Sequence, residues 1–145
     1  MPLQNILKKS ITYASPGDTV RYVAEMMSDE DVGAVVIVET GMPRGIVTDR
    51  DIVLRCLAMR LDPDYTAVEE IMTTGVETVT INDGIFDVIK TMRLAEVRRV
   101  VIVDENQNAV GLLSLDDILD LLGEEMNSLR QAVAPKRPKI LERVA

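Results

Sequence analysis

The chain of 145 residues contains the same pattern twice. Residues 6–38 align with residues 71–103 without a gap, and the run VVIV occurs at the same place in both copies. After one extra residue in the following loop, GIVTDRDIV at 45–53 aligns with GLLSLDDIL at 111–119. A repeat of this length indicates two copies of one supersecondary unit, which must pack together to bury their apolar faces.

The hydrophobic periodicity changes in the same order within each copy. Apolar residues at i, i+3, i+4 and i+7 predict one helix per copy, at Val20, Val23, Ala24 and Met27 and at Ile85, Val88, Ile89 and Met92. We expect these helices to begin at Asp18 and Asp83. The remaining elements predicted are strands at about 11–14, 34–38, 77–81 and 100–103, a further strand leading into each GIVTDRDIV-like motif, and helices at 49–60 and about 115–132.

The predicted order is therefore β-α-β-β-α, twice, in an α/β fold of the α+β type. We place the first repeat at 1–62 and the second at 63–122, with a packed linker that holds a Pro turn and a short helix at about 64–72. Residues 123–145 are the end of the last helix and a basic tail containing PKRPK. For this tail two interpretations stay open, a partly ordered end or a contact with a dimer mate or partner.

Composition excludes several classes of function. A formal charge of −8 argues against nucleic acid as a partner. No apolar run reaches the ~18 residues of a membrane span, so we expect a cytoplasmic protein with no membrane partner. The chain has no His, the commonest general base and metal ligand, and its single Cys56 has apolar neighbours typical of a buried thiol. We therefore expect no catalytic residue, no metal site and no required cofactor.

The motif at 45–53 has two interpretations that are compatible. Thr48 followed by Asp51 is the pattern of a capping box, which satisfies free backbone N–H groups at a helix start. The same groups, at the end of a strand, are also placed to bind a ligand, and an acid there can accept from both hydroxyls of a ribose. The repeat places Ser114 and Asp117 in the same pattern.

The chain resembles a tandem cystathionine-β-synthase (CBS) domain pair over about residues 3–122. The likeness rests on G-x-x-[ST]-x-x-D occurring twice and on SPGDTV at 15–20, AVEEIMT at 67–73 and EVRRVVIVDE at 96–105. The resemblance implies two repeats packed around a pseudo-twofold axis, a homodimer, and adenosine-containing ligands bound in clefts between the repeats.

The resemblance also implies particular ligand contacts. Thr48 and Asp51 would hold ribose or phosphate at a first site, and Ser114, Asp117 and Thr73 would belong to a weaker second site. The adenine base would meet backbone near Ile11, Thr12, Gly33 and Ala34, with Ile46 as an apolar wall. Gly33 has an alternative interpretation, as the glycine that ends a helix.

The repeat provides an internal comparison of the two sites. Family proteins often place basic residues for the phosphates at the start of the central strand, where Arg98 and Arg99 align with the uncharged Gly33 and Ala34. Lys8 and Lys9 align with Thr73 and Thr74, and Arg50 aligns with Asp116. We therefore predict that the first site carries the phosphate, because a phosphate needs nearby cations. The alternative for Arg98 and Arg99 is a solvated pair near Glu96.

These observations predict a regulatory sensor of cellular energy that binds AMP, or ADP or ATP, and modulates an unknown protein partner. S-adenosylmethionine is a competing ligand, although its cationic sulfonium suits the basic first site poorly. A dimerisation scaffold without ligand, in which both motifs only cap helices, is a second alternative. An enzyme is the third, and no group that resembles a tuned catalytic base supports it.

Overall fold

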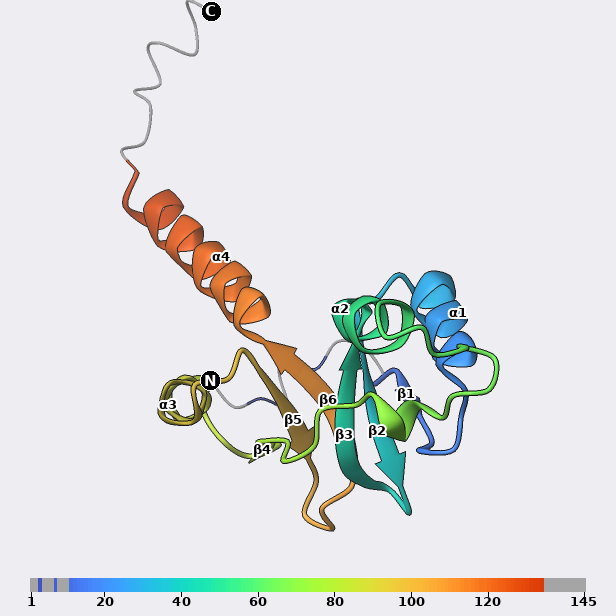
Figure 1. Cartoon of the computed structure of the whole chain (residues 1–145). Helices are drawn as coiled ribbons and strands as arrows, with labels where there is room; N and C mark the ends of the chain where they lie inside the picture. Colours follow the sequence, from blue (N-terminus) through green and yellow to red (C-terminus); the bar gives the residue numbers. More distant parts are fainter. Residues whose placement is uncertain (1–2, 4–6, 8–10, 135–145) are drawn as a thin grey trace, which may run out of the picture. The chain divides into compact units, whose positions relative to one another are not determined.

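The computed structural model describes residues 3, 7 and 11–134 (Figure 1). The first repeat comprises β1 (Tyr13–Ala14), α1 (Val20–Glu30), β2 (Ala34–Glu39), β3 (Met42–Thr48), α2 (Asp49–Asp51) and the π-helix η2 (Ile52–Leu57). The second comprises the 3₁₀-helix η3 (Val68–Glu70), β4 (Thr78–Thr80), α3 (Ile85–Ala95), β5 (Arg99–Val103), β6 (Ala109–Ser114) and α4 (Leu115–Val133). The predicted β-α-β-β-α order, twice, is thus confirmed.

Each repeat builds one three-stranded sheet, β1-β2-β3 or β4-β5-β6. In both sheets the first pair is parallel and the second antiparallel, since a helix connects the first two strands and a hairpin the last two. The register pairs Ala34 with Thr48 in one sheet and Arg99 with Ser114 in the other. Ala34 and Arg99 therefore occupy equivalent positions, as the repeat alignment predicted.

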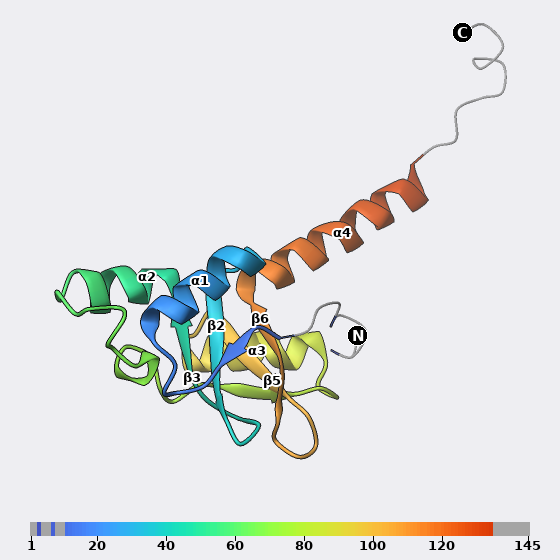
Figure 2. The ribbon, with the colours of Figure 1, turned by 90° about the vertical axis from the view of Figure 1, so that its right-hand side faces the viewer.

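The two faces of β2 are buried in different ways. Val35 and Ile37 belong to a core with α1, η2 and the linker, and α1 and α2 lie along the same side of this sheet in Figure 2. Val36 points the other way and packs with Val101 and Val103 of β5. Because both faces are covered, the strands read as continuous β-branched runs rather than alternating ones.

The helices α1 and α3 begin two residues later than predicted, at Val20 and Ile85. The expected first residues instead close the preceding turns. Asp18 accepts a hydrogen bond from the Ser15 N–H at 2.8 Å, and Asp83 accepts one from the Thr80 N–H at 2.9 Å. Such side-chain contacts to nearby backbone compete with helix formation, which explains the shift.

The segment before each repeat docks on the other repeat. The Val68 N–H donates to the Asp18 carbonyl at 2.7 Å, and the equivalent Leu3 N–H donates to the Asp83 carbonyl at 3.1 Å. Val68 and Leu3 are fully buried. The linker packs as predicted, but its helix is only the single 3₁₀ turn Val68–Glu70, because its backbone also bonds to the start of α1.

The helix predicted at 49–60 changes type after one turn. Only Asp49–Asp51 is α-helical, and Ile52–Leu57 is a π-helix, with the Ala58 N–H bonded to the Val53 carbonyl. The helix predicted at 115–132 is present as α4 and ends at Val133. No helix among the described residues is long and apolar enough to cross a bilayer.

Candidate functional site

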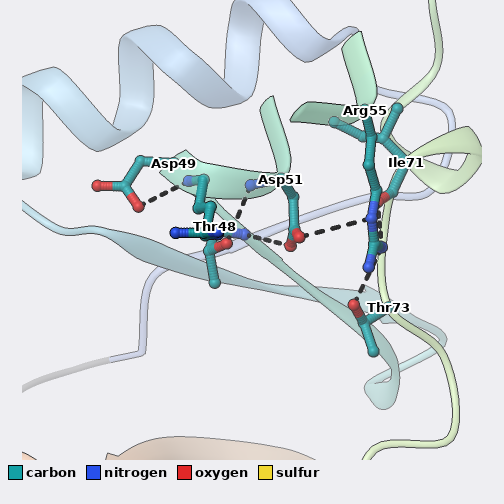
Figure 3. Close-up of polar contacts among 7 residues, drawn as sticks. Thr48, Asp49, Asp51, Arg55, Ile71 and Thr73 are labelled. Atoms are coloured by element: carbon teal, nitrogen blue, oxygen red, sulfur yellow. Dashed lines mark hydrogen bonds and ion pairs between the residues drawn. The ribbon is translucent and has the colours of Figure 1, made fainter. Parts of the chain in front are cut away.

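The motif at the end of β3 forms the predicted capping box. The Thr48 hydroxyl accepts a hydrogen bond from the Asp51 N–H at 3.2 Å, and the Asp51 carboxylate accepts one from the Thr48 N–H at 2.9 Å (Figure 3). These bonds fix both side chains at the junction of strand and helix. The Asp51 side chain stays 15% exposed, so it is not fully buried.

Arg55 lies one turn further along and joins this motif to the linker. Its Nε lies 3.7 Å from Asp51 Oδ1, while its Nη1 donates to the Ile71 carbonyl at 3.0 Å and to the Thr73 hydroxyl at 3.1 Å (Figure 3). The linker is also held to β3 by two backbone hydrogen bonds between Ile46 and Thr73. Side-chain and backbone contacts therefore fix Thr73 beside Thr48 and Asp51.

A cleft of about 210 Å³ opens at this place between the two repeats. It is lined by Ile46, Thr48, Asp51, Thr73, Thr74, Gly75, Val76, Glu77, Val97, Arg98 and Arg99. The lining combines an apolar part with hydroxyls, carboxylates and two guanidinium groups. An arrangement of a largely apolar cleft with a few polar groups is typical of small-molecule sites.

The structure brings together five of the residues predicted for the first site, namely Ile46, Thr48, Asp51, Arg98 and Arg99. Other predicted members do not line this cleft. Thr12 donates from its hydroxyl to Glu30 at 2.7 Å, and Gly33 accepts at its carbonyl from the Asp49 N–H at 3.1 Å. The predicted first-site residues that do not line the cleft are Ile11, Thr12, Gly33, Ala34 and Arg50. Lys8 and Lys9 lie outside the described residues.

The structure places Thr73 in the lining of the first cleft. It was predicted for the second site with Ser114 and Asp117, but it lines the first cleft and contacts Arg55. The sequence alignment of repeats cannot reveal this, because the linker crosses to the first repeat before β4 begins. Ser114 ends β6 and Asp117 lies in α4, so their second site stays a prediction.

Sequence reasoning missed five residues of the cleft. They are Thr74, Gly75, Val76, Glu77 and Val97. One signal was available, since 74–77 directly follow the AVEEIMT run and 97 directly precedes the two arginines. Glu77 adds a second carboxylate to that of Asp51, opposite in charge to Arg98 and Arg99. The described residues contain no group of three or more His, Cys, Asp or Glu side chains placed to hold a metal ion.

Comparison with known families agrees with this geometry. The model of the CBS domain matches the chain twice, at residues 3–57 and 68–124. The chain belongs to the CBS domain family. This CBS domain pair is 34% identical over 116 residues to the CBS domain-containing protein YhcV of Bacillus subtilis, an alignment that covers 80% of this chain and 81% of that protein.

Solved structures of CBS domain pairs have the same fold. The CBS domain protein PAE2072 of Pyrobaculum aerophilum, complexed with AMP, has a TM-score of 0.72 and 28% identity, over 85% of this chain and 99% of that one. The CBS domain pair of protein MJ0100, in complex with 5′-methylthioadenosine and S-adenosyl-L-methionine, has a TM-score of 0.74 and 26% identity, over 86% and 98%. Both relatives bind adenosine-containing ligands.

Proposed function

We propose that this CBS domain pair is a regulatory module that binds an adenine nucleotide, AMP in preference to ADP or ATP, in the cleft between its repeats. The observation that carries the proposal is the presence of the Thr48 and Asp51 pair and of Arg98 and Arg99 in one cleft. A nucleoside phosphate needs both, since its ribose offers hydroxyl donors and its phosphate needs cations.

Each group has a distinct role in this proposal. Asp51 accepts from the ribose hydroxyls, and the Thr48 hydroxyl contacts ribose or phosphate. Arg98 and Arg99 bind the phosphate, because charge-assisted hydrogen bonds to guanidinium are strong and directional. Ile46, Val76 and Val97 supply apolar walls for the base.

S-adenosylmethionine is the second candidate, since the pair in MJ0100 is complexed with it. Its carboxylate suits an arginine, but its sulfonium cation would be repelled by the pair of guanidinium groups. Glu77 offsets part of that repulsion. We rank AMP first because one phosphate carries more negative charge than the zwitterionic amino-acid moiety can offer.

We further propose that ligand binding regulates a protein partner and that the module works as a homodimer without catalysis of its own. A nucleotide in the cleft would contact both repeats, since Asp51 belongs to the first and Arg99 to the second. Its differential affinity for two arrangements of the repeats limits how far it can shift them. If AMP, ADP and ATP compete for the cleft and differ in their affinity for the two arrangements, the module would act as a sensor of cellular energy.

The test is isothermal titration with AMP, ADP, ATP and S-adenosylmethionine, of the native chain and of Asp51→Asn. The asparagine retains an oxygen that can accept from the Thr48 N–H, so the cap is preserved while the charge is lost. We expect one tight site for AMP per chain and at least a tenfold loss in Asp51→Asn. Asp49→Asn, a neighbour that does not line the cleft, is the matched control and should bind normally.

Three further outcomes are informative. Asp117→Asn should weaken AMP binding much less than Asp51→Asn, and the opposite ranking would reject the assignment of the phosphate to the first site. Heat with S-adenosylmethionine alone would replace AMP by the second candidate. No heat with any ligand, after removal of co-purified nucleotide, would leave the capping role as the only function of the motif.

A further inference from the structure

The helix α4 carries a stripe of exposed apolar side chains. The larger members are between 37% and 76% exposed, and they are Leu119, Leu122, Met126, Leu129 and Val133. The stripe continues beyond the part of the chain that the CBS domain model matches, which ends at residue 124. Figure 1 shows α4 as one continuous helix.

The spacing of this stripe is that of a coiled coil. From Leu115 the apolar positions follow at alternating steps of four and three residues. They therefore fit the a and d positions of a heptad, with Leu119, Met126 and Val133 at a and Leu115, Leu122 and Leu129 at d. Leucine at every d position suits a parallel pair of helices, in which d packs against d.

The intrinsic helix propensity of α4 is modest, so we expect the helix to be stabilised by packing against a partner. Gly123, Asn127 and Ser128 lie in its interior, and all three are weaker helix formers than Ala or Leu. Most helices owe their stability to packing of an apolar face rather than to propensity. An exposed stripe this long on a helix of modest propensity indicates a surface that is covered in the functional assembly.

Charges beside the stripe are complementary to those of a second copy of the same helix. With the heptad above, Glu125 takes position g and Arg130 takes position e. In a parallel two-stranded coiled coil, g of one helix faces the e that lies five residues later in the other. Glu125 therefore faces Arg130 of the second copy, twice by symmetry. In an antiparallel pair g faces g, so Glu125 would lose this partner.

We infer that α4 forms a parallel two-stranded coiled coil with α4 of a second copy. The contact is isologous, since the same stripe serves on both helices. This inference does not depend on the ligand of the cleft, because none of the residues involved line it. It does supply a surface for the homodimer proposed above.

The test uses sedimentation equilibrium of the full chain over a range of concentrations. We expect a dimer in the native chain and at least a tenfold larger dissociation constant in Met126→Glu/Leu129→Glu. Gln131→Glu, at the outward f position of the same helix, is the matched control and should dimerise normally. Circular dichroism and urea unfolding report whether each variant folds. A monomeric native chain, or a folded double variant that dimerises as tightly as the native chain, would overturn the inference.

Charge exchange and cross-linking test the orientation. Glu125→Arg should weaken the dimer, and adding Arg130→Glu to it should restore the affinity. In a Cys56→Ala background, Val133→Cys should form a disulfide between two copies on mild oxidation, since a faces a in a parallel pair. Gln131→Cys should not. A dimer in which Val133→Cys fails to cross-link, or in which the charge exchange restores nothing, would reject the parallel coiled coil.

Discussion

The Arg55 guanidinium lies 3.7 Å from the Asp51 carboxylate and simultaneously binds the Ile71 carbonyl and the Thr73 hydroxyl. One side chain of the first repeat thus connects the acid of the motif to the linker that lines the cleft. The π-helical backbone of 52–57 carries this arginine. Single π turns within helices are frequently found at functional sites. This one carries Arg55, which orients Asp51, the residue proposed to bind the ribose.

From this relationship we predict that Arg55→Ala weakens AMP binding about three- to tenfold while it lowers the free energy of unfolding by less than about 1 kcal/mol. The Arg55 side chain is about half exposed, so the contribution of its ion pair to stability is small, but its loss leaves Asp51 and Thr73 less well oriented. Titration calorimetry and urea unfolding measure the two effects. Unchanged affinity in the folded variant would show that the Arg55 contacts serve only the fold.

The second prediction concerns the phosphate. Arg99→Ala should weaken AMP binding by about 10- to 100-fold, since a hydrogen bond to a charged group contributes roughly 1.5–3 kcal/mol. Binding of adenosine, which lacks the phosphate, should change less than about threefold by the same reasoning. Arg44→Ala removes an arginine that pairs with Glu39 outside the cleft, and it should leave both affinities unaltered. Equal losses for AMP and adenosine in Arg99→Ala would make Arg99 a structural residue.

The third prediction concerns the glycine of the motif. A Cβ at Gly45 would lie 2.8 Å from the Thr73 carbonyl oxygen and 2.6 Å from Met72 Sδ. We expect Gly45→Ala to destabilise the fold by about 1–3 kcal/mol, because β3 and the linker would have to separate. Gly17→Ala, where a Cβ meets no atom within 4 Å, should change stability by less than about 1 kcal/mol. Urea unfolding compares the two variants, and equal midpoints would refute the close approach of β3 and the linker.

The fourth prediction concerns Cys56, which is fully buried and donates to the Leu61 carbonyl. Burial raises the pKa of this thiol, and the nearby Asp62 raises it further. The folded state therefore holds the thiol proton more tightly than the unfolded chain, whose cysteine titrates near 8.5. The stabilisation is fully present below about pH 8.5 and is lost as pH rises through the folded pKa.

We therefore expect the native chain to lose stability above about pH 8.5 more steeply than Cys56→Ala does, with both measured under reducing conditions. Because the other titrating groups are common to both chains, the difference isolates the thiol. Parallel curves for the two chains would contradict the raised pKa of Cys56.

Much of this protein can be read from its sequence. The repeat predicted the order of elements in both halves, because hydrophobic periodicity is a local property that survives packing. Thr48 and Asp51 were identifiable as a cap, since their bonds span only three residues. The presence of uncharged Ala34 and charged Arg99 at equivalent positions was also visible, because the two registers follow the alignment.

Tertiary structure alone decided the rest. Thr73 entered the first cleft through its backbone pairing with Ile46, a contact between distant segments that no periodicity encodes. The π-helix replaced the predicted α-helix after Asp51, and with it came the position of Arg55. The docking of Val68 and Leu3 on opposite repeats likewise depends on where the chain crosses over. Local pattern fixes which elements form, whereas long-range backbone hydrogen bonds and burial fix which of their side chains meet.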